Sequence, residues 1–437
     1  MRIQTLLLVL GDIHLLVSGI ATTTIKEDLK PHSFVNTDYV RGNKVLASKV
    51  IELNVGDFIH PKEIMNEDVH AAFQLVYQHY KKSDNSVEQE PTQDQIQQAL
   101  TLLNARDQTK ATMTLIGYKG GAMASQINQD RAVIVSPYIW WNDKFDTIEQ
   151  HQHDFIVGAF DGHGGGGEIV SEFVATQLPK LLAYKLQQTT PLDSAKISKL
   201  LHETFIELDE SSPSPASLTG GCAASIVVRI GSKLYVANAG DSRTLVGVST
   251  QSEQATSMLH SVHYVTREDK PHLPDERARV ESRKGQVYIP PNPGGTSRVM
   301  HTDPETGGRF GLAMSRSIGD WNVGQYGVIP DPIIEIIDLD NFQQQCTANQ
   351  GTCANPQDAS NLFNLGIFVA SASDGLFDFV TPEDLAFAVG QTFYGTANSH
   401  PIATLGDLMS MAVHGWNDKH GGRYRDDIVI AVHKVIL

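Results

Sequence analysis

Residues 155–168 read FIVGAFDGHGGGGE, and this stretch decides how the rest of the chain is interpreted. Its first six residues form an apolar run with the length of a buried strand, and the run stops at Asp161, Gly162 and His163. Four glycines follow, where bare backbone lets a ligand approach closely, and a helical pattern begins at Glu168. The stretch therefore places a carboxylate and an imidazole beside open backbone, although Asp-Gly after a strand is, taken alone, a turn signal.

Three further aspartates lie at the ends of predicted strands. Asp241 and Asp374 each follow an apolar run, and Asp426 precedes the apolar run that closes the chain. A closing strand antiparallel to its neighbour would bring Asp426 to the same sheet edge as the other carboxylates. Taken singly, these residues also fit ordinary roles: a turn, a salt bridge between Asp241 and Arg243, or a solvated acidic pair at Asp426.

The shared position of the four carboxylates favours a metal site over four independent turns. Two carboxylates about 4 Å apart repel each other by about 4 kcal/mol at an effective dielectric of about 20, so a cation is expected among them. Oxygen ligands suit hard cations such as Mg²⁺ or Mn²⁺ better than zinc. The sequence therefore predicts a hydrolytic site with two such ions, which would activate a water and hold a phosphoryl group.

Length and composition narrow the class of protein. The chain has 437 residues and 41% hydrophobic content, enough for a substantial core in two domains or in one large domain with an extension. The net charge of −16 argues against a nucleic-acid partner, because surplus Lys and Arg hold phosphate backbones. Three cysteines, Cys222, Cys346 and Cys353, exclude a disulfide scaffold and argue against structural zinc. Cys346 and Cys353 could close one small loop.

The N-terminus is interpreted as a leader followed by an extension. Residues 1–21 resemble a secretory signal peptide, with Arg2 before a leucine-rich run that is too short for a comfortable membrane span. The chain has no Asn-x-Ser/Thr acceptor, which speaks against secretion and keeps a buried N-terminal helix or a mis-started chain as alternatives. We expect a secretory or extracellular location if the leader is cleaved, and a cytoplasmic one otherwise. Residues 22–110 are the extension, with helices predicted over 69–80 and 96–103.

Residues 111–437 are predicted to form the catalytic domain, with a flap insertion near 266–311. The flap is polar and contains a predicted helix over Pro274–Lys284, and a plain surface insertion fits its composition equally well. Elsewhere a hairpin is predicted over residues 222–239, and the helix that begins at Glu168 is predicted to break or restart at Pro179.

Five motifs resemble those of the metal-dependent serine/threonine protein phosphatases of type 2C, in that family's order. They are Phe160–Gly165, Tyr235–Arg243, Ser315–Asp320, Ala372–Asp378 and Arg425–Ile428. The resemblance runs from about Lys110 to the C-terminus. It implies an α+β fold, a four-layer α-β-β-α sandwich of two antiparallel sheets flanked by helices, with two Mn²⁺ or Mg²⁺ ions between the sheet edges. It further implies a monomer without a stable membrane span, which hydrolyses phosphoserine and phosphothreonine in phosphoprotein substrates.

The resemblance also implies a role for each site residue. Asp161 would bridge both ions, the Gly162 carbonyl would bind one of them, and Asp374 and Asp426 would hold the other. Asp241 matches the position that, together with Asp374, serves a weaker third ion. His163 would be the general acid that protonates the departing Ser or Thr oxygen, while a water held between the ions attacks phosphorus. The plainer alternative for His163 is a buried, hydrogen-bonded imidazole.

The first motif departs from the family pattern. Many members have a phosphate-binding Arg and a Glu-Asp pair there, whereas the aligned residues in this chain are Ser125, Gln129 and Asp130. Gln129 lacks the charge that Glu would lend to the site, which predicts weaker affinity for the nearby ion. Lys119 or Arg131 could replace the missing Arg, although each also fits a solvated surface charge. In the last motif, a milder change places Asp427 where Asn is usual.

Two other functions are alternatives to the metal-dependent phosphatase. A cysteine-based phosphatase needs a Cys-x5-Arg loop, but Arg229 comes one residue too late after Cys222 and the intervening residues are an apolar strand. The second rival is a catalytically impaired pseudophosphatase that binds phosphoproteins, which the altered first motif would explain. The residues that remain intact favour the enzyme, namely Asp161, His163, Asp374 and Asp426.

Overall fold

The computed structural model describes most of the chain beyond residue 108. The described residues are 45–46, 49–53, 62–63, 109–120, 126–138, 140, 151–252, 258–292, 295–302, 307–340, 362–395 and 401–436. The leader over 1–21, the helices predicted over 69–80 and 96–103, Ser125, Cys346 and Cys353 lie outside these residues. Among the described residues, no helix combines the length and the apolar character needed to cross a membrane.

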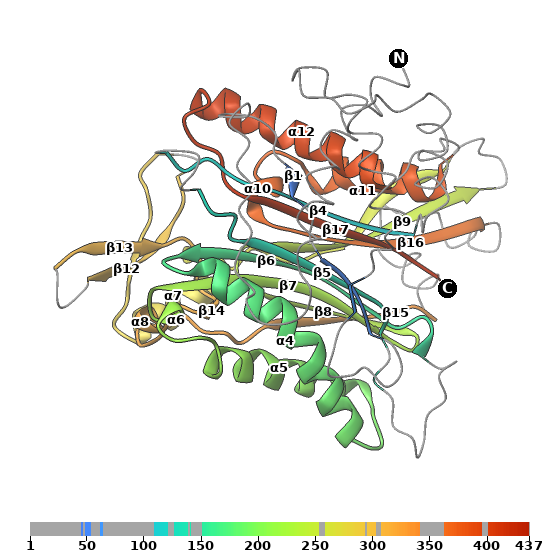
Figure 1. The fold of residues 1–437 in the computed structure, drawn as a ribbon, viewed down its shortest axis with the longest axis horizontal. Helices are drawn as coiled ribbons and strands as arrows, with labels where there is room; N and C mark the ends of the chain where they lie inside the picture. Colours follow the sequence, from blue (N-terminus) through green and yellow to red (C-terminus); the bar gives the residue numbers. More distant parts are fainter. Residues whose placement is uncertain are drawn as a thin grey trace, which may run out of the picture.

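Two β-sheets stack face to face in the middle of the molecule (Figure 1). The six-stranded sheet has the spatial order β1 (Val45–Leu46), β4 (Lys110–Leu115), β17 (Ile428–Val435), β16 (Leu362–Ala372), β9 (Arg243–Ser252) and β10 (Leu259–Val265). The eight-stranded sheet has the order β15 (Ile333–Asp338), β8 (Lys233–Ala239), β7 (Gly220–Ile230), β6 (Phe155–Gly164), β5 (Asp130–Tyr138), β2 (Lys49–Leu53) and β3 (Lys62–Glu63), with β14 (Ile318–Gly319) paired to β7. Every pair of neighbours is antiparallel except β2 with β5.

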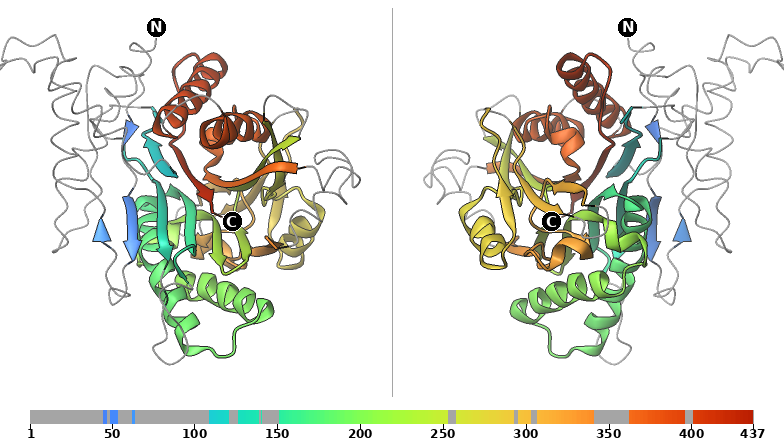
Figure 2. Two further views of the ribbon diagram at one scale, coloured as in Figure 1. Left: turned by 90° about the vertical axis from the view of Figure 1, so that its right-hand side faces the viewer. Right: turned by 90° about the vertical axis from the view of Figure 1, so that its left-hand side faces the viewer.

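Helices cover the outer face of each sheet, as Figure 2 shows from two sides. The helices over the six-stranded sheet are α11 (Pro382–Tyr394) and α12 (Pro401–His420), and those over the eight-stranded sheet are α4 (Gly167–Gln188) and α5 (Ser194–Glu210). Short helices α6 (Ala216–Thr219), α8 (Trp321–Gly324) and α10 (Asp374–Phe377) lie at sheet ends. The predicted α+β fold, a four-layer α-β-β-α sandwich, is confirmed.

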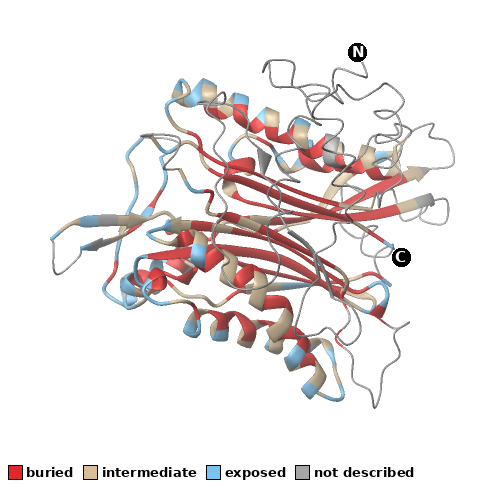
Figure 3. Cartoon of the chain, in the orientation of Figure 1, coloured by how far each residue is buried: buried red, intermediate tan, exposed pale blue. Residues whose placement is uncertain are grey.

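The strands are almost continuously apolar because both of their faces are buried (Figure 3). Between the sheets, Phe155 and Val227 of one sheet pack in the same cluster as Val369 of the other. On the outer faces, Leu178 of α4 packs against the eight-stranded sheet, and Trp416 of α12 packs in the cluster that covers the six-stranded sheet. These three apolar layers hold the sheet ends, and the motifs they carry, at fixed positions.

Helix α4 runs unbroken through Pro179, so the predicted break is wrong. A proline inside a helix removes a backbone hydrogen bond and costs about 3 kcal/mol. The neighbours Leu178 and Leu182 are fully buried against the sheet, and the Tyr138 hydroxyl donates to the Pro179 carbonyl at 2.8 Å. Tertiary packing therefore offsets the local preference.

The segment predicted as a flap has regular structure of its own. It contains α7 (Pro274–Ser282) and a three-stranded sheet of β11 (Gln286–Tyr288), β12 (Arg298–Thr302) and β13 (Arg309–Leu312). Val280, Val299, Val323 and Val328 form a small core beneath it. In Figure 1, β12 and β13 project from the side of the sandwich.

Candidate metal centre

The sequence motifs meet where the chain passes between the two sheets. Strand β4 of the six-stranded sheet leads to β5 of the other, and Asp130 begins β5 directly opposite Asp161 of β6. Asp241 lies where the chain crosses back, between β8 and β9. Asp374 follows β16, and Asp426 precedes its antiparallel neighbour β17, which is the arrangement the sequence suggested.

Three of the predicted metal ligands come together at this point. Asp161, Asp241 and Asp374 each offer a carboxylate oxygen, and these atoms all lie within 4.8 Å of one another. The sequence predicts that the strand stops at Asp161, whereas β6 continues to Gly164, because residues 220–222 of β7 provide pairing partners. Gly162 is thus paired with Cys222 of β7 and directly follows Asp161 of the carboxylate cluster.

The electrostatics of the cluster indicate a missing positive charge. Burial raises the pKa of Asp161 well above its usual range, and the nearby carboxylates, first Asp130 and Asp374, raise it further. The pKa values of Asp130 and Asp374 are raised for the same two reasons. Asp241 Oδ1 is buried without a hydrogen-bond partner in the described part of the chain. Oxygen donors that are buried, crowded and partly unpartnered fit hard divalent cations.

Asp426 is placed next to this cluster but is engaged by other groups. Its Oδ1 accepts hydrogen bonds from Lys119 Nζ and from the Asp427 backbone N–H, both at 2.9 Å. Its Oδ2 accepts from the Tyr424 hydroxyl at 2.9 Å. Asp426 still lies close enough to raise the pKa of Asp374. A carboxylate has about four acceptor positions, so these three contacts leave one position at Oδ2 for the predicted metal ion.

Asp427 of the last motif is hydrogen-bonded to two backbone N–H groups of the segment that holds the first motif. Its Oδ1 accepts from the Gly117 backbone N–H at 2.6 Å, and its Oδ2 accepts from the Gln129 backbone N–H at 3.2 Å. Lys119 Nζ lies 3.2 Å from the same Oδ2. Burial alone would lower the pKa of Lys119, but Asp427 and Asp426 raise it, so the ammonium stays charged. Lys119 is therefore part of the site and not a solvated surface charge.

Gln129 faces the glycine loop. Its side-chain amide donates to the Gly164 carbonyl and to Glu168 Oε2, both at 3.0 Å. The backbone carbonyl of Gln129 accepts a hydrogen bond from the Gly162 N–H at 3.2 Å. Gln129 is thus hydrogen-bonded to the glycine loop and to the first turn of α4. Arg131 is bound to Glu172 of α4 at 2.6 Å, which removes it as a candidate for the missing phosphate-binding Arg.

His163 is oriented by an aspartate that sequence reasoning did not single out. Its Nε2 lies 2.6 Å from Asp320 Oδ2, and the Ser317 hydroxyl donates to the same oxygen at 2.7 Å. Burial alone would lower the pKa of His163, but the Asp320 carboxylate reverses this and raises it above 6.5. Asp320 adopts a left-handed φ of 55°, and its N–H donates to the Gly220 carbonyl at 2.8 Å. The third motif is the only sequence signal that contains it.

Lys270 is a second residue that the sequence analysis missed. Its Nζ lies 2.7 Å from Asp241 Oδ2 and 3.9 Å from Asp374 Oδ2. Burial would lower its pKa, but Asp241 and Asp374 raise it, so the ammonium is charged. No lysine occurs in the motifs around Asp161 or Asp374, and Lys270 arrives from the start of the flap segment.

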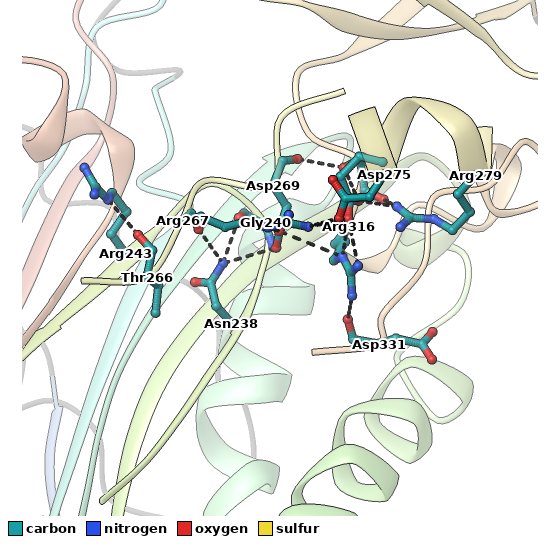
Figure 4. Close-up of polar contacts among 12 residues, drawn as sticks. Asn238, Gly240, Arg243, Thr266, Arg267, Asp269, Asp275, Arg279, Arg316 and Asp331 are labelled. Carbon is teal, nitrogen blue, oxygen red and sulfur yellow. Dashed lines mark hydrogen bonds and ion pairs between the residues drawn. The ribbon is translucent and has the colours of Figure 1, made fainter. Parts of the chain in front are cut away.

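A buried glutamate ties the flap segment to the sheet end that carries Asp241. Glu276 of α7 is fully buried and accepts hydrogen bonds from Arg267 at 2.6 Å, Arg316 at 2.7 Å and Ser315 at 2.5 Å, and from Arg279. We call these five residues the Glu276 network, and its arginines appear in Figure 4. Burial by itself would raise the pKa of Glu276, but these hydrogen bonds lower it to about 2.

The network reaches the metal cluster through Asp269. Arg267 Nε donates to Asp269 Oδ1 at 3.0 Å, and Asp269 Oδ2 accepts from the Gly240 N–H at 3.1 Å (Figure 4). Gly240 directly precedes Asp241, so the position of Asp241 depends on this chain of contacts.

The cysteine-based alternative has no support in the structure. Cys222 is fully buried in β7, and burial raises the pKa of its thiol well above the usual range, which is opposite to what a nucleophile needs. Arg229 donates to the Gly231 carbonyl at 2.9 Å, at the far end of the same strand. The two residues form no phosphate cradle.

Comparison with known sequences identifies the class that this fold and site define. The family described as "Protein phosphatase 2C" matches residues 138–398, more than half of the chain. The chain belongs to the protein phosphatase 2C family, whose members are metal-dependent protein serine/threonine phosphatases.

Similar proteins come from plants and from a parasite. "Probable protein phosphatase 2C 41" of Arabidopsis thaliana is 30% identical over 234 residues, which cover 49% of this chain and 61% of that protein. "Probable protein phosphatase 2C 61" of the same plant is 27% identical, with 72% of this chain and 81% of that protein covered. The serine-threonine phosphatase 2C structure from Toxoplasma gondii has a TM-score of 0.54 at 15% identity and covers 75% of this chain and 94% of that one, a likeness in fold.

Proposed function

We propose that this chain hydrolyses phosphoserine and phosphothreonine in proteins with two Mn²⁺ or Mg²⁺ ions held at the carboxylate cluster. The observation that carries the proposal is the gathering of Asp161, Asp241 and Asp374 oxygens within 4.8 Å, from strand ends of two different sheets. Asp161, the Gly162 carbonyl and Asp374 would hold the ions, with Asp426 beside them. Bound ions of this kind acidify a water and neutralise charge on a phosphoryl group.

His163 is proposed as the general acid. The Asp320 carboxylate at 2.6 Å orients the imidazole and stabilises its protonated form, which is the form that can give a proton to the leaving Ser or Thr oxygen. Ser317 in turn fixes Asp320. Each of these partners acts on the ring and not on the substrate, so they are positioning residues.

Lys119 is proposed as the cation that contacts the substrate phosphate in place of the missing Arg. Its side chain is 35% exposed, whereas Asp427 beneath it is 2% exposed, so the ammonium can reach solvent from the edge of the cluster. An ammonium binds phosphate as a point charge, without the two-pronged geometry of Arg. We therefore expect a looser hold on the phosphate than an Arg would give.

The test is hydrolysis of a phosphothreonine peptide by the full chain, with Mn²⁺ or Mg²⁺ and with a chelator. We expect turnover only with metal, and none from Asp374→Asn. Asp384→Asn is the matched control, because Asp384 is an exposed carboxylate in the first turn of α11, away from the cluster. Turnover in the chelator, or full activity of Asp374→Asn, would contradict the mechanism.

The pseudophosphatase alternative rests on the altered first motif, in which Gln129 is neutral and the phosphate-binding Arg is missing. It predicts that the same peptide binds to the full chain but is never hydrolysed, with any of the metals. The assay above therefore distinguishes the enzyme from the binding module.

A further inference from the structure

We propose that the ammonium group of Lys270 occupies the place that a third metal ion would take between Asp241 and Asp374, so that this chain binds two ions and not three. The inference rests on the proposed phosphatase site, and it assigns a positioning role to a residue outside the sequence motifs. As a built-in cation, Lys270 would attract both Asp241 and Asp374 and offset the repulsion between them.

The contacts of Lys270 are those of a site residue. Its Nζ is 2.7 Å from Asp241 Oδ2 and 3.9 Å from Asp374 Oδ2, and its side chain is 15% exposed. Asp241 is 1% exposed, so the pair is shielded from solvent. A lysine this well covered and this close to two carboxylates is not exchanging freely with water.

The backbone on both sides fixes where this side chain starts. The Asp269 N–H donates to the Gly240 carbonyl at 2.9 Å, and the Gly240 N–H donates back to the Asp269 carboxylate at 3.1 Å. On the other side, the Leu273 N–H donates to the Lys270 carbonyl at 3.1 Å. Gly240 and Asp269 are therefore bonded to each other, and the residues that follow them, Asp241 and Lys270, lie side by side.

A third ion and this ammonium compete for the same atoms. An ion bound by Asp241 and Asp374 would need the carboxylates that Lys270 already contacts, and two cations at that spacing repel each other. An ion at the other oxygen of Asp241 would still lie beside the same ammonium. Because Lys270 is tethered at the site, the fold favours it over an ion from solution.

The test counts bound ions. The full chain is stripped of metal and titrated with Mn²⁺, and bound Mn²⁺ is measured by electron paramagnetic resonance of the free ion and by calorimetry. We expect two sites in the wild type and a third, weaker site in Lys270→Met. Arg243→Met is the matched control: it removes a nearby positive charge, but Arg243 donates to the Thr266 carbonyl and lies over the Phe377 ring. The number of Mn²⁺ sites in Arg243→Met should stay at two.

A second measurement separates the role of Lys270 from general damage. Without metal, Lys270→Met should melt at a lower temperature than the wild type, and saturating Mn²⁺ should restore most of the difference. Lys270→Arg should keep the count at two. Three sites in the wild type, or two in folded Lys270→Met, would overturn this inference alone. No sites in the wild type would overturn the proposed function as well, so the two failures can be distinguished.

Discussion

The Glu276 network gives the most quantitative prediction. Glu276→Gln keeps the size of the side chain but removes its charge from among Arg267, Arg279 and Arg316. The pKa of Glu276 is lowered from 4.5 to about 2. At about 1.4 kcal/mol per pKa unit, this difference corresponds to about 3 kcal/mol of stability at neutral pH. Removing one partner of a buried ion pair costs about 3–5 kcal/mol in general, so two lines of reasoning agree.

The assay is urea unfolding at pH 7, followed by tryptophan fluorescence. Glu281→Gln is the matched control on the same helix, because Glu281 is 49% exposed and, within the described part of the chain, forms an ion pair with Arg277 at 2.7 Å. Exposed pairs of this spacing contribute about 0.5 kcal/mol or less. We expect Glu276→Gln to lose at least five times as much unfolding free energy as Glu281→Gln.

The pH dependence follows from the sign of the pKa change. The pKa of Glu276 is lower in the folded than in the unfolded chain, so its contribution is complete above about pH 4.5 and is lost as the pH falls towards 2. The advantage of the wild type over Glu276→Gln should therefore shrink between about pH 4.5 and about pH 2. A loss below about 1 kcal/mol at pH 7, or an advantage that does not change with pH, would refute this account of the network.

Two further predictions address the site itself. Lys119→Met should raise KM for a phosphopeptide about ten- to a hundred-fold while kcat changes less, since a hydrogen bond to a charged group contributes about 1.5–3 kcal/mol. Lys119→Arg should restore most of the loss. An unchanged KM in Lys119→Met would show that Lys119 does not contact the phosphate. Gly375→Ala should lower the melting temperature sharply, because its Cβ would lie 2.0 Å from the Asp427 carbonyl, whereas Gly324→Ala, with open space around its Cβ, should not. Equal melting temperatures for these two variants would contradict the close contact between α10 and β17.

The acidic residues were predictable because each one follows or precedes an apolar run. The runs before Asp241 and Asp374 are buried on both faces, so their ends could be placed from sequence alone. The end of β6 could not, because its continuation to Gly164 depends on pairing with Gly220 and Gly221, two glycines that precede the strand predicted from Cys222. The helix break predicted at Pro179 was wrong for the same reason, because the packing of α4 against the sheet cannot be inferred from the sequence around Pro179.

Lys270 and the contact of Asp320 with His163 were the parts of the site that the sequence could not predict. Lys270 lies 29 residues after Asp241, and two hydrogen bonds between Asp269 and Gly240 hold their segments together in the folded chain. Asp320 reaches His163 through a left-handed backbone conformation and the pairing of β14 with β7. Such contacts depend on the assembled fold, whereas an aspartate at a strand end is a local pattern.

The division of the ligands between the sheets bears on how the protein assembles. Asp130 and Asp161 belong to the eight-stranded sheet, whereas Asp374 and Asp426 flank β16 and β17 of the other. Neither sheet by itself carries the whole set, however well its own strands are formed. In a refolding experiment, the first appearance of tight Mn²⁺ binding would therefore time the moment at which the two halves of the sandwich dock.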